Sequence, residues 1–249
     1  MGALEAVTRW TPTVASVLRE AGVPQQDIAQ YTAATLALIH YESRGNPTIV
    51  ETRKGTGAYG LTQQIARWHP QHKGNPRAHL LHFAQRLRAN TKPGGATAGN
   101  IQSFFQAWAS GPPAVNYYVT NGRYPASPPQ MPQQVRNITD MVAGRTWSAY
   151  GSYVAAWIQA GQPTTAQQID GRMFQVSPPG LSAVALASPS DGYLVWKGKR
   201  RKIGAPGPGG MTNIQVRPQG GTSDGSGRVG WVLLLVLAAG GYLVWQGAK

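Results

Sequence analysis

Glu42 is the residue of this chain whose position best suits acid–base chemistry. It follows Ile39 by three residues and Leu38 by four, so a helix through this stretch turns its carboxyl group toward the apolar side. A carboxylic acid that stays protonated near neutral pH can donate a proton to the leaving oxygen of a glycosidic bond, and an apolar wall raises its pKa into that range. From spacing alone, however, a solvated Glu in the last turn of a helix is the more common arrangement.

Carboxylates are scarce around Glu42. Four of the six in residues 1–145 lie in no motif: Glu5, Glu20, Asp27 and Asp140. Glu51, in the loop after Glu42, is the one nearby candidate for a second acid. Hydrolytic glycosidases commonly need two carboxylates, whereas internal attack by a sugar hydroxyl needs one. The scarcity therefore favours the internal route.

Three short motifs follow one another in the first half of the chain. They are Ala37-Leu-Ile-His-Tyr-Glu-Ser-Arg-Gly-Asn-Pro47, Gly57-Ala-Tyr-Gly-Leu-Thr-Gln63 and Phe105-Gln-Ala-Trp-Ala-Ser-Gly-Pro-Pro-Ala-Val115. In this order they resemble the consecutive signatures of the soluble lytic transglycosylase family, whose members have a goose-type lysozyme-like fold. The resemblance covers roughly residues 35–120. It implies a peptidoglycan-cleaving enzyme that uses no cofactor.

The resemblance also implies a role for individual residues. Glu42 would be the sole general acid and then the base, while the muramyl C6 hydroxyl attacks internally and leaves a 1,6-anhydro product. The side chains and backbone that would contact the glycan are those of Ser43, Tyr59, Gly60, Gln63, Trp108 and Tyr117.

The chain departs from the family pattern at two places. Ala109 stands where the third signature usually has Asn, and the Tyr that often closes the site is not evident near Val135-Arg-Asn-Ile138. Tyr117 or Tyr118 would have to substitute for it. These departures support the alternative of a non-enzymatic membrane or virion structural protein with a degenerate lysozyme-like domain.

The spacing of apolar residues predicts a mainly α fold. One helix is expected from Thr11-Pro12 to Gly22, and a second from about Pro24 to Ser43 with Ile28, Thr32, Thr35 and Ile39 on its inner stripe. A loop or short β excursion should follow through Gly57 and Gly60. Further helices are predicted around 76–90, 98–109, 112–120 and 131–145, which completes a lysozyme-like domain at residues 1–145.

Beyond residue 145 the composition changes in three steps. Residues 146–160 carry aromatics at helical spacing and predict an amphipathic helix, packed on the domain rather than on a membrane. Residues 161–228 are rich in Pro, Gly, Ser and Gln, as flexible linkers are. Residues 229–246 begin with seventeen uncharged, mostly apolar residues flanked by aromatics, which predicts a transmembrane anchor. Residues 181–196 are a less favoured second membrane segment.

Two clusters of residues suggest ligands. His69, His72, His79 and His82 form an H-x2-H…H-x2-H pattern, but no acidic residue lies among them, so histidines that line a surface or groove are expected and no metal site is predicted. The second cluster is a compact basic run before the predicted anchor, suited to anionic lipid or nucleic acid. It consists of Lys197, Lys199, Arg200, Arg201 and Lys202.

Charge and composition limit where such an enzyme would work. The chain has no cysteine, which excludes disulfides and thiolate metal sites, and its net charge of +14 favours polyanionic partners. The N-terminus lacks a signal-peptide pattern, and the positive charge before the anchor would hold the enzyme on the cytoplasmic side, away from peptidoglycan. The overall plan resembles virion-associated transglycosylases of membrane-containing bacteriophages, which resolves this conflict; a wall-opening enzyme of a conjugation or secretion system is the next choice.

Overall fold

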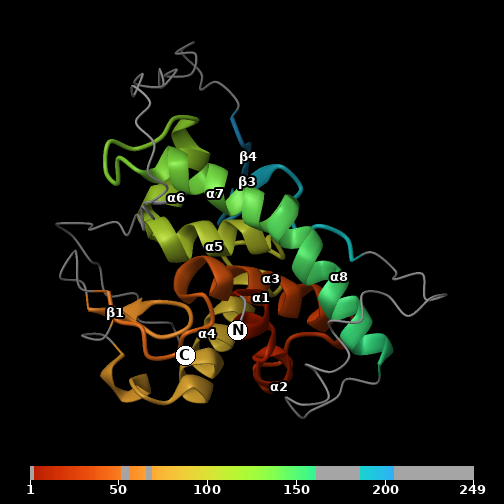
Figure 1. The fold of residues 1–249 in the computed structure, drawn as a ribbon. Helices are drawn as coiled ribbons and strands as arrows, with labels where there is room; N and C mark the ends of the chain where they lie inside the picture. Colours follow the sequence, from red (N-terminus) through yellow and green to blue (C-terminus); the bar gives the residue numbers. More distant parts are fainter. Residues whose placement is uncertain (1–2, 52–56, 66–68, 161–185, 205–249) are drawn as a thin grey trace, which may run out of the picture.

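The fold is mainly helical, as predicted (Figure 1). The computed structural model describes residues 3–51, 57–65, 69–160 and 186–204. The helices are α1 Ala3–Thr8, α2 Thr11–Glu20, α3 Ile28–Ser43, α4 Pro76–Thr91, α5 Ile101–Ser110, α6 Pro112–Asn121, α7 Met131–Ala143 and α8 Arg145–Gln159, with the 3-10 turns η1 Gln25–Asp27 and η2 Pro70–His72. The short strands are β1 Ala58–Tyr59, β2 Gln64–Ile65, β3 Tyr193–Trp196 and β4 Lys199–Lys202.

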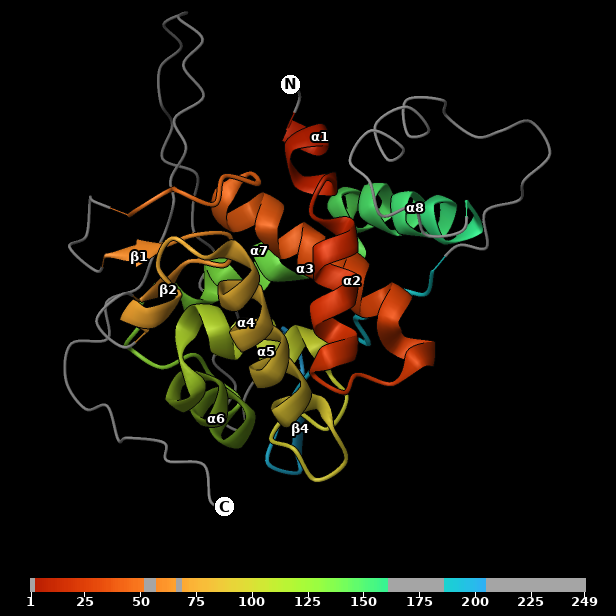
Figure 2. The same cartoon turned by 90° about the horizontal axis from the view of Figure 1, so that it is seen from below.

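Helix α3 is the centre of the core. Its sequence is apolar or small on every side, and a helix of that kind must be surrounded by protein. Neighbouring helices α1, α2, α7 and α8 pack around it, and α2 lies directly alongside it when the molecule is seen from below (Figure 2). Twelve of its sixteen residues are buried, and these include the four predicted for the inner stripe.

The later helices lie where the apolar spacing predicts them, with small differences at their ends. Helix α5 begins at Ile101 rather than near residue 98, because the Asn100 side chain accepts a hydrogen bond from the backbone N–H of Ser103 and caps the helix there. Asn75 caps α4 in the same way, with Pro76 at its first position. Capping therefore sets boundaries that hydrophobic periodicity leaves open.

Helix α8 belongs to the same core as α2 and α3. Its aromatic stripe faces inward: Trp147 is 6% exposed, Tyr150 1% and Trp157 4%. The helix runs along α3 and α7 (Figure 1). The expected packing of this stripe on the domain is confirmed.

Strands β3 and β4 correct the prediction that residues 161–228 are a flexible linker throughout. They form an antiparallel hairpin with Lys197 and Gly198 at its turn, both at positive φ. Leu194 and Trp196 alternate inward and are buried against α5 and α6. This part of the expected linker is thus folded, and β3 is a strand on the domain rather than a membrane segment. Residues 161–185 and 205–228 lie outside the described residues.

The basic run, Lys197 to Lys202, lies on this hairpin, and several of its charged side chains form contacts with other residues of the protein. Arg200 forms an ion pair with Asp191 at 3.0 Å and lies over the Tyr193 ring. The Lys199 ammonium donates to the Thr120 hydroxyl, and Arg201 reaches backbone carbonyls at the C-terminal end of α6, where a helix attracts cations. Binding of anionic lipid or nucleic acid by this run stays a prediction.

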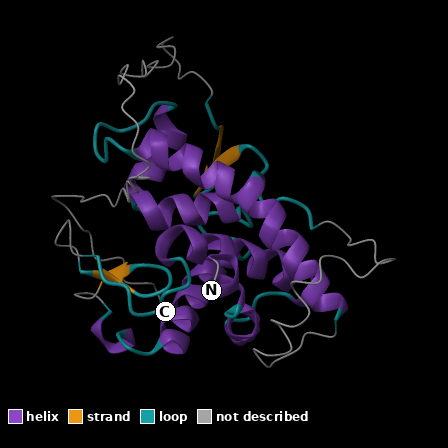
Figure 3. Ribbon diagram, in the orientation of Figure 1, coloured by secondary structure: helices purple, strands orange, loops and turns teal. Residues whose placement is uncertain are grey.

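The predicted excursion after α3 is a small antiparallel unit. Strand β1 pairs with β2, and Tyr59 also pairs with Val50 on its other side. The two small sheets lie apart from each other at the periphery of the helices (Figure 3). Among the described residues no helix has the length and hydropathy to cross a membrane, and the predicted anchor 229–246 lies outside them.

The turn that ends α3 is fixed by contacts with the N-terminal helices. Arg44 and Gly45 both adopt positive φ, and the Gly45 carbonyl accepts hydrogen bonds from Arg9 and from the Trp10 indole, each at 3.0 Å. A Cβ on Gly45 would lie 2.2 Å from the backbone oxygen of Ala6. Only glycine fits there, so this contact sets where α3 stops.

Replacement of Gly45 by Ala should therefore destabilise the fold strongly. The Gly45→Ala variant combines left-handed backbone strain with a clash against backbone, and we expect it to lower the free energy of unfolding by about 3 kcal/mol. Gly22→Ala is the matched control, since Gly22 has the same φ of +78° but open space around its Cβ position. The control should cost about 1 kcal/mol. Urea denaturation of both variants measures the difference, and equal losses would contradict the close contact.

Candidate active site

Glu42 lies in the last turn of α3 with its carboxyl group taken out of water. The residue is 8% exposed, and within the described part of the chain no hydrogen bond or ion pair reaches its carboxyl group. Burial disfavours the charged form and raises the pKa of Glu42 to about 8. The group is therefore mainly protonated at neutral pH, which is the state that a general acid requires.

Ser43, predicted to contact the glycan, is occupied by the helix end. Its hydroxyl donates to the Ile39 carbonyl at 3.0 Å and accepts from the Gly45 N–H at 3.3 Å, and the residue is 2% exposed. These bonds close the turn that carries Glu42. In the structure Ser43 holds the position of the acid rather than presenting a free hydroxyl.

Gly60 and Gln63 shape the turn between β1 and β2. Gly60 has a φ of +74°, and a Cβ there would meet the His79 ring at 2.8 Å, so the position requires glycine. Gln63 also adopts positive φ, and its side-chain amide donates to the Gly60 carbonyl at 2.9 Å. The Oε1 atom of Gln63 is buried with no hydrogen-bond partner among the described residues. An unsatisfied buried acceptor of this kind is suited to a ligand hydroxyl or N–H.

His79 holds this turn onto α4, a role that sequence reasoning missed. Its Nε2 accepts a hydrogen bond from the Thr62 N–H at 3.1 Å, and its backbone carbonyl accepts from the Gln64 amide. Tyr59 meets the His79 ring edge to face, while the Tyr59 hydroxyl donates to the His69 carbonyl at 2.6 Å. Burial and nearby imidazoles lower the pKa of His79 to about 3, so the ring is neutral and stabilises the turn through hydrogen bonds.

Trp108 joins the third motif to the second. Its indole N–H donates to the Thr62 carbonyl at 2.8 Å, and its ring packs edge to face on Phe83 with centroids 4.9 Å apart. The side chain is only partly buried, so part of the indole remains accessible. The second and third motifs are therefore joined by a direct hydrogen bond.

Two further residues that the sequence did not single out connect α3 to α7. The Asn137 amide donates to the Tyr41 hydroxyl at 3.0 Å, and Tyr41 directly precedes Glu42. The burial of Tyr41 and the nearby Glu42 carboxylate raise the pKa of its hydroxyl. Asn137 lies within the segment expected to carry the missing family Tyr, so this contact brings a polar group beside the end of α3.

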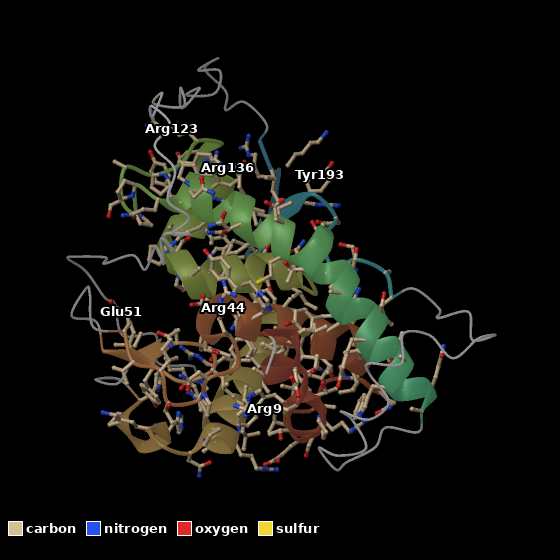
Figure 4. The ribbon with its side chains drawn as sticks, in the orientation of Figure 1. Arg9, Arg44, Glu51, Arg123, Arg136 and Tyr193 are labelled. Atoms are coloured by element: carbon tan, nitrogen blue, oxygen red, sulfur yellow. The ribbon has the colours of Figure 1, made fainter. Side chains whose placement is uncertain are left out.

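The two tyrosines considered for the site both lie on α6. The hydroxyl of Tyr117 accepts a hydrogen bond from Arg123 in the loop after α6, and Tyr118 is buried with its hydroxyl bonded to the backbone of Lys202 and Gly204. Both hydroxyl groups are thus engaged with other parts of the protein, and a role for either in closing the site stays a prediction. Figure 4 shows Arg44 at the end of α3 and Glu51 on the side of β1, far from Arg123 and Arg136.

Glu51 belongs to the excursion that follows α3. Its backbone N–H donates to the Ala58 carbonyl at 2.7 Å, and the residue is 8% exposed. A hollow lies beside the turn, and Glu42 does not line it. The lining residues come from both sides of the turn and are Pro47, Tyr59, Gly60, Leu61, His72, Gly74, Asn75, Pro76 and His79. The candidate site is therefore built on the Glu42 carboxyl group, and the β1–β2 turn belongs to the motif that follows it in the sequence.

The chain was compared with known proteins at three levels. No protein-family model, no curated protein and no solved structure matches it. The assignment of function therefore rests on the three motifs and on the geometry around Glu42.

The raised pKa of Glu42 should appear as a dependence of stability on pH. Because the folded protein holds this proton up to about pH 8 and the unfolded chain releases it near 4.5, stability should fall as pH rises from about 4.5 to about 8 and then level off. The Glu42→Gln variant removes this loss. Relative to wild type it should gain a few kcal/mol between pH 4.5 and pH 8, since one pKa unit corresponds to about 1.4 kcal/mol.

Urea denaturation at closely spaced pH values measures this difference. Glu20→Gln is the control for removal of a carboxylate, because Glu20 lies on the surface in an ion pair with Arg77. A constant difference between Glu42→Gln and wild type across this pH range would show that the Glu42 carboxyl is not desolvated.

Proposed function

We propose that this chain is a peptidoglycan lytic transglycosylase that cleaves the bond between N-acetylmuramic acid and N-acetylglucosamine with Glu42 as its only catalytic acid and base. The observation that carries the proposal is a carboxyl group at the end of a buried helix, with its pKa raised to about 8, inside the motif that resembles the family's first signature. Trp108 supports it, since the hydrogen bond to Thr62 places the third motif on the second.

The reaction needs a single carboxyl group that gives a proton and takes one back. Protonated Glu42 donates to the glycosidic oxygen as the bond from C1 of the muramyl residue to that oxygen breaks. The C6 hydroxyl of the same residue then attacks C1, and the Glu42 carboxylate accepts its proton. The net result is an N-acetylglucosamine end and a 1,6-anhydromuramyl end, with the acid regenerated and no water consumed.

The groups around the turn would bind the glycan. The unpartnered Oε1 of Gln63 can accept a hydrogen bond from a sugar hydroxyl or an acetamido N–H, and the indole of Trp108 offers an apolar face for a sugar ring. Gly60 lets the turn pack against the His79 ring, and its carbonyl accepts the hydrogen bond that orients the Gln63 amide. Asn137 donates to the hydroxyl of Tyr41, the residue before Glu42.

Activity and product both test this proposal. The Glu42→Gln variant should lose about 10²- to 10⁴-fold in the rate of muropeptide release from purified cell wall, which is the usual contribution of a general acid. Glu20→Gln should cleave as wild type does. Mass spectrometry of the wild-type products should find muropeptides one water lighter than hydrolysed ones.

The outcomes separate three functions. Hydrolysed muropeptides, together with loss of activity in the Glu51→Gln variant, would indicate a hydrolase that uses two carboxylates. Clearing that survives Glu42→Gln would remove Glu42 from its role. No clearing by folded wild-type protein would favour the alternative, a non-enzymatic virion or membrane structural protein.

The location of the enzyme is part of the proposal. Residues 229–246 would anchor it in a lipid membrane, and a membrane inside a bacteriophage particle would bring the domain to the host periplasm and its wall at the start of infection. Support for this comes from the sequence pattern of that segment and from the basic residues before it.

Deletion of residues 229–249 should abolish association with lipid. Full-length protein should float with phosphatidylglycerol-containing vesicles at high salt, and the truncated protein should remain at the bottom of the gradient. Substitution of the five basic residues of the run by Gln, with the anchor intact, is the matched control and should leave flotation at high salt unchanged, because salt screens the surface charges. Flotation of the truncated protein under these conditions would contradict the anchor.

A further inference from the structure

Three of the four histidines in the H-x2-H…H-x2-H pattern meet on one side of the β1–β2 turn. His69 precedes η2, His72 ends it, and His82 lies on α4. One ring nitrogen from each lies within 4.8 Å of the others. The rings of His69 and His82 have centroids 4.3 Å apart, and those of His72 and His82 are 4.7 Å apart. The fourth histidine, His79, is turned away to Thr62.

The ring nitrogens of this cluster are not all satisfied by the protein. Nε2 of His82 is buried and has no hydrogen-bond partner among the described residues. Such an atom costs about 1–3 kcal/mol if nothing binds it. A metal ion is one partner that would satisfy it. Burial and the neighbouring imidazoles lower the pKa of His82 to about 4 and lower that of His69, so both rings are neutral at pH 7 with a lone pair to offer.

His72 carries the outer contact that metal-binding histidines usually have. Its Nδ1 lies 3.2 Å from the Oε1 atom of Gln64, an acceptor, so Nδ1 holds the proton and Nε2 is left for a ligand. Gln64 in turn donates from its amide to the backbone of His79. The orientation of the His72 ring is therefore fixed through β2 and α4 rather than by the cluster itself.

We propose that His69, His72 and His82 bind one zinc ion, with a water molecule at the fourth position. Three neutral imidazoles and an open position are a known zinc ligand set. Tetrahedral ligands at 2.0–2.1 Å from zinc lie about 3.3 Å apart, so the three nitrogens would close by about 1.5 Å at most. Among the described residues no carboxylate completes the group, so its donors are nitrogen atoms alone. A donor set of this kind favours a borderline metal that prefers nitrogen over calcium or magnesium.

The ion would brace the segment that carries the candidate substrate-binding turn. His69 and His72 belong to the stretch that follows β2, while His82 belongs to α4, which packs into the core. His79 already joins the turn to α4 through Thr62. Zinc would add a second attachment on the far side of β2. This inference stands apart from the proposed function, because metal binding can be measured without any activity.

The test uses the full-length chain in mild detergent, made without a histidine tag, freed of metal with EDTA and titrated with ZnCl₂. Competition with a chromophoric chelator should give one zinc per chain, and CoCl₂ should give the visible absorption of a four- or five-coordinate site. The His82→Gln and His69→Gln variants should each weaken zinc binding at least 100-fold. His40→Gln, which changes the one histidine outside the pattern, is the matched control and should bind as wild type does.

Thermal unfolding gives a second readout. Zinc should raise the Tm of wild type and of His40→Gln, and it should leave the Tm of His69→Gln unchanged. His69 is only partly buried, so this variant serves if His82→Gln fails to fold by circular dichroism. Folded wild type that binds no stoichiometric zinc would overturn the proposal. Binding that is undiminished in folded His69→Gln would also overturn it, since the site would then lie elsewhere.

Discussion

The burial of α3 on every side is the constraint on which the other features depend. A helix that is apolar all round can only exist with protein around it, and α1, α2, α7 and α8 supply that surrounding. Its last turn carries Glu42, which is drawn out of water together with its apolar neighbours. The raised pKa thus follows from the packing of the whole helix, because no nearby charge contributes to it. The left-handed turn at Arg44 and Gly45 then ends the helix directly after Glu42 and Ser43.

The turn between β1 and β2 is held by neutral polar groups. The His79 imidazole, the Trp108 indole and the Gln63 amide all bond to backbone in this turn. The pKa of His79 is lowered to about 3, so its imidazole is neutral at pH 7, and the indole and the amide do not ionise in this range. Hydrogen bonds between uncharged groups therefore fix the turn, and these bonds do not depend on pH near neutrality.

The sequence predicts most of the helices because their apolar residues recur at helical spacing or Pro and Gly mark their ends, whereas the short helix α1 was not predicted. The inner stripe of α3 and the aromatic stripe of α8 are of this kind, and both are buried. The hairpin was missed because its inward residues, Leu194 and Trp196, are only two, and they lie between Pro-rich and basic stretches that look like linker. Tyr41, Asn137 and His79 could not be assigned, since their roles depend on contacts between residues far apart in the chain. Ser43 was placed by its motif, but its hydroxyl is engaged in the turn.

The hairpin also limits how far the folded domain can lie from a membrane if residues 229–246 anchor the chain as proposed. If the connection between the folded domain and the anchor began directly after α8, it would comprise residues 161–228 and could extend at most about 240 Å. Because β3 and β4 return the chain to α5 and α6, only residues 205–228 separate the folded body from the anchor, and they reach at most about 85 Å. Because the hairpin is folded, the longest possible connection between the folded domain and the anchor is about a third of what it would be from the end of α8. Under the proposed function, a single anchored molecule would reach only the glycan strands within that shorter distance of the membrane.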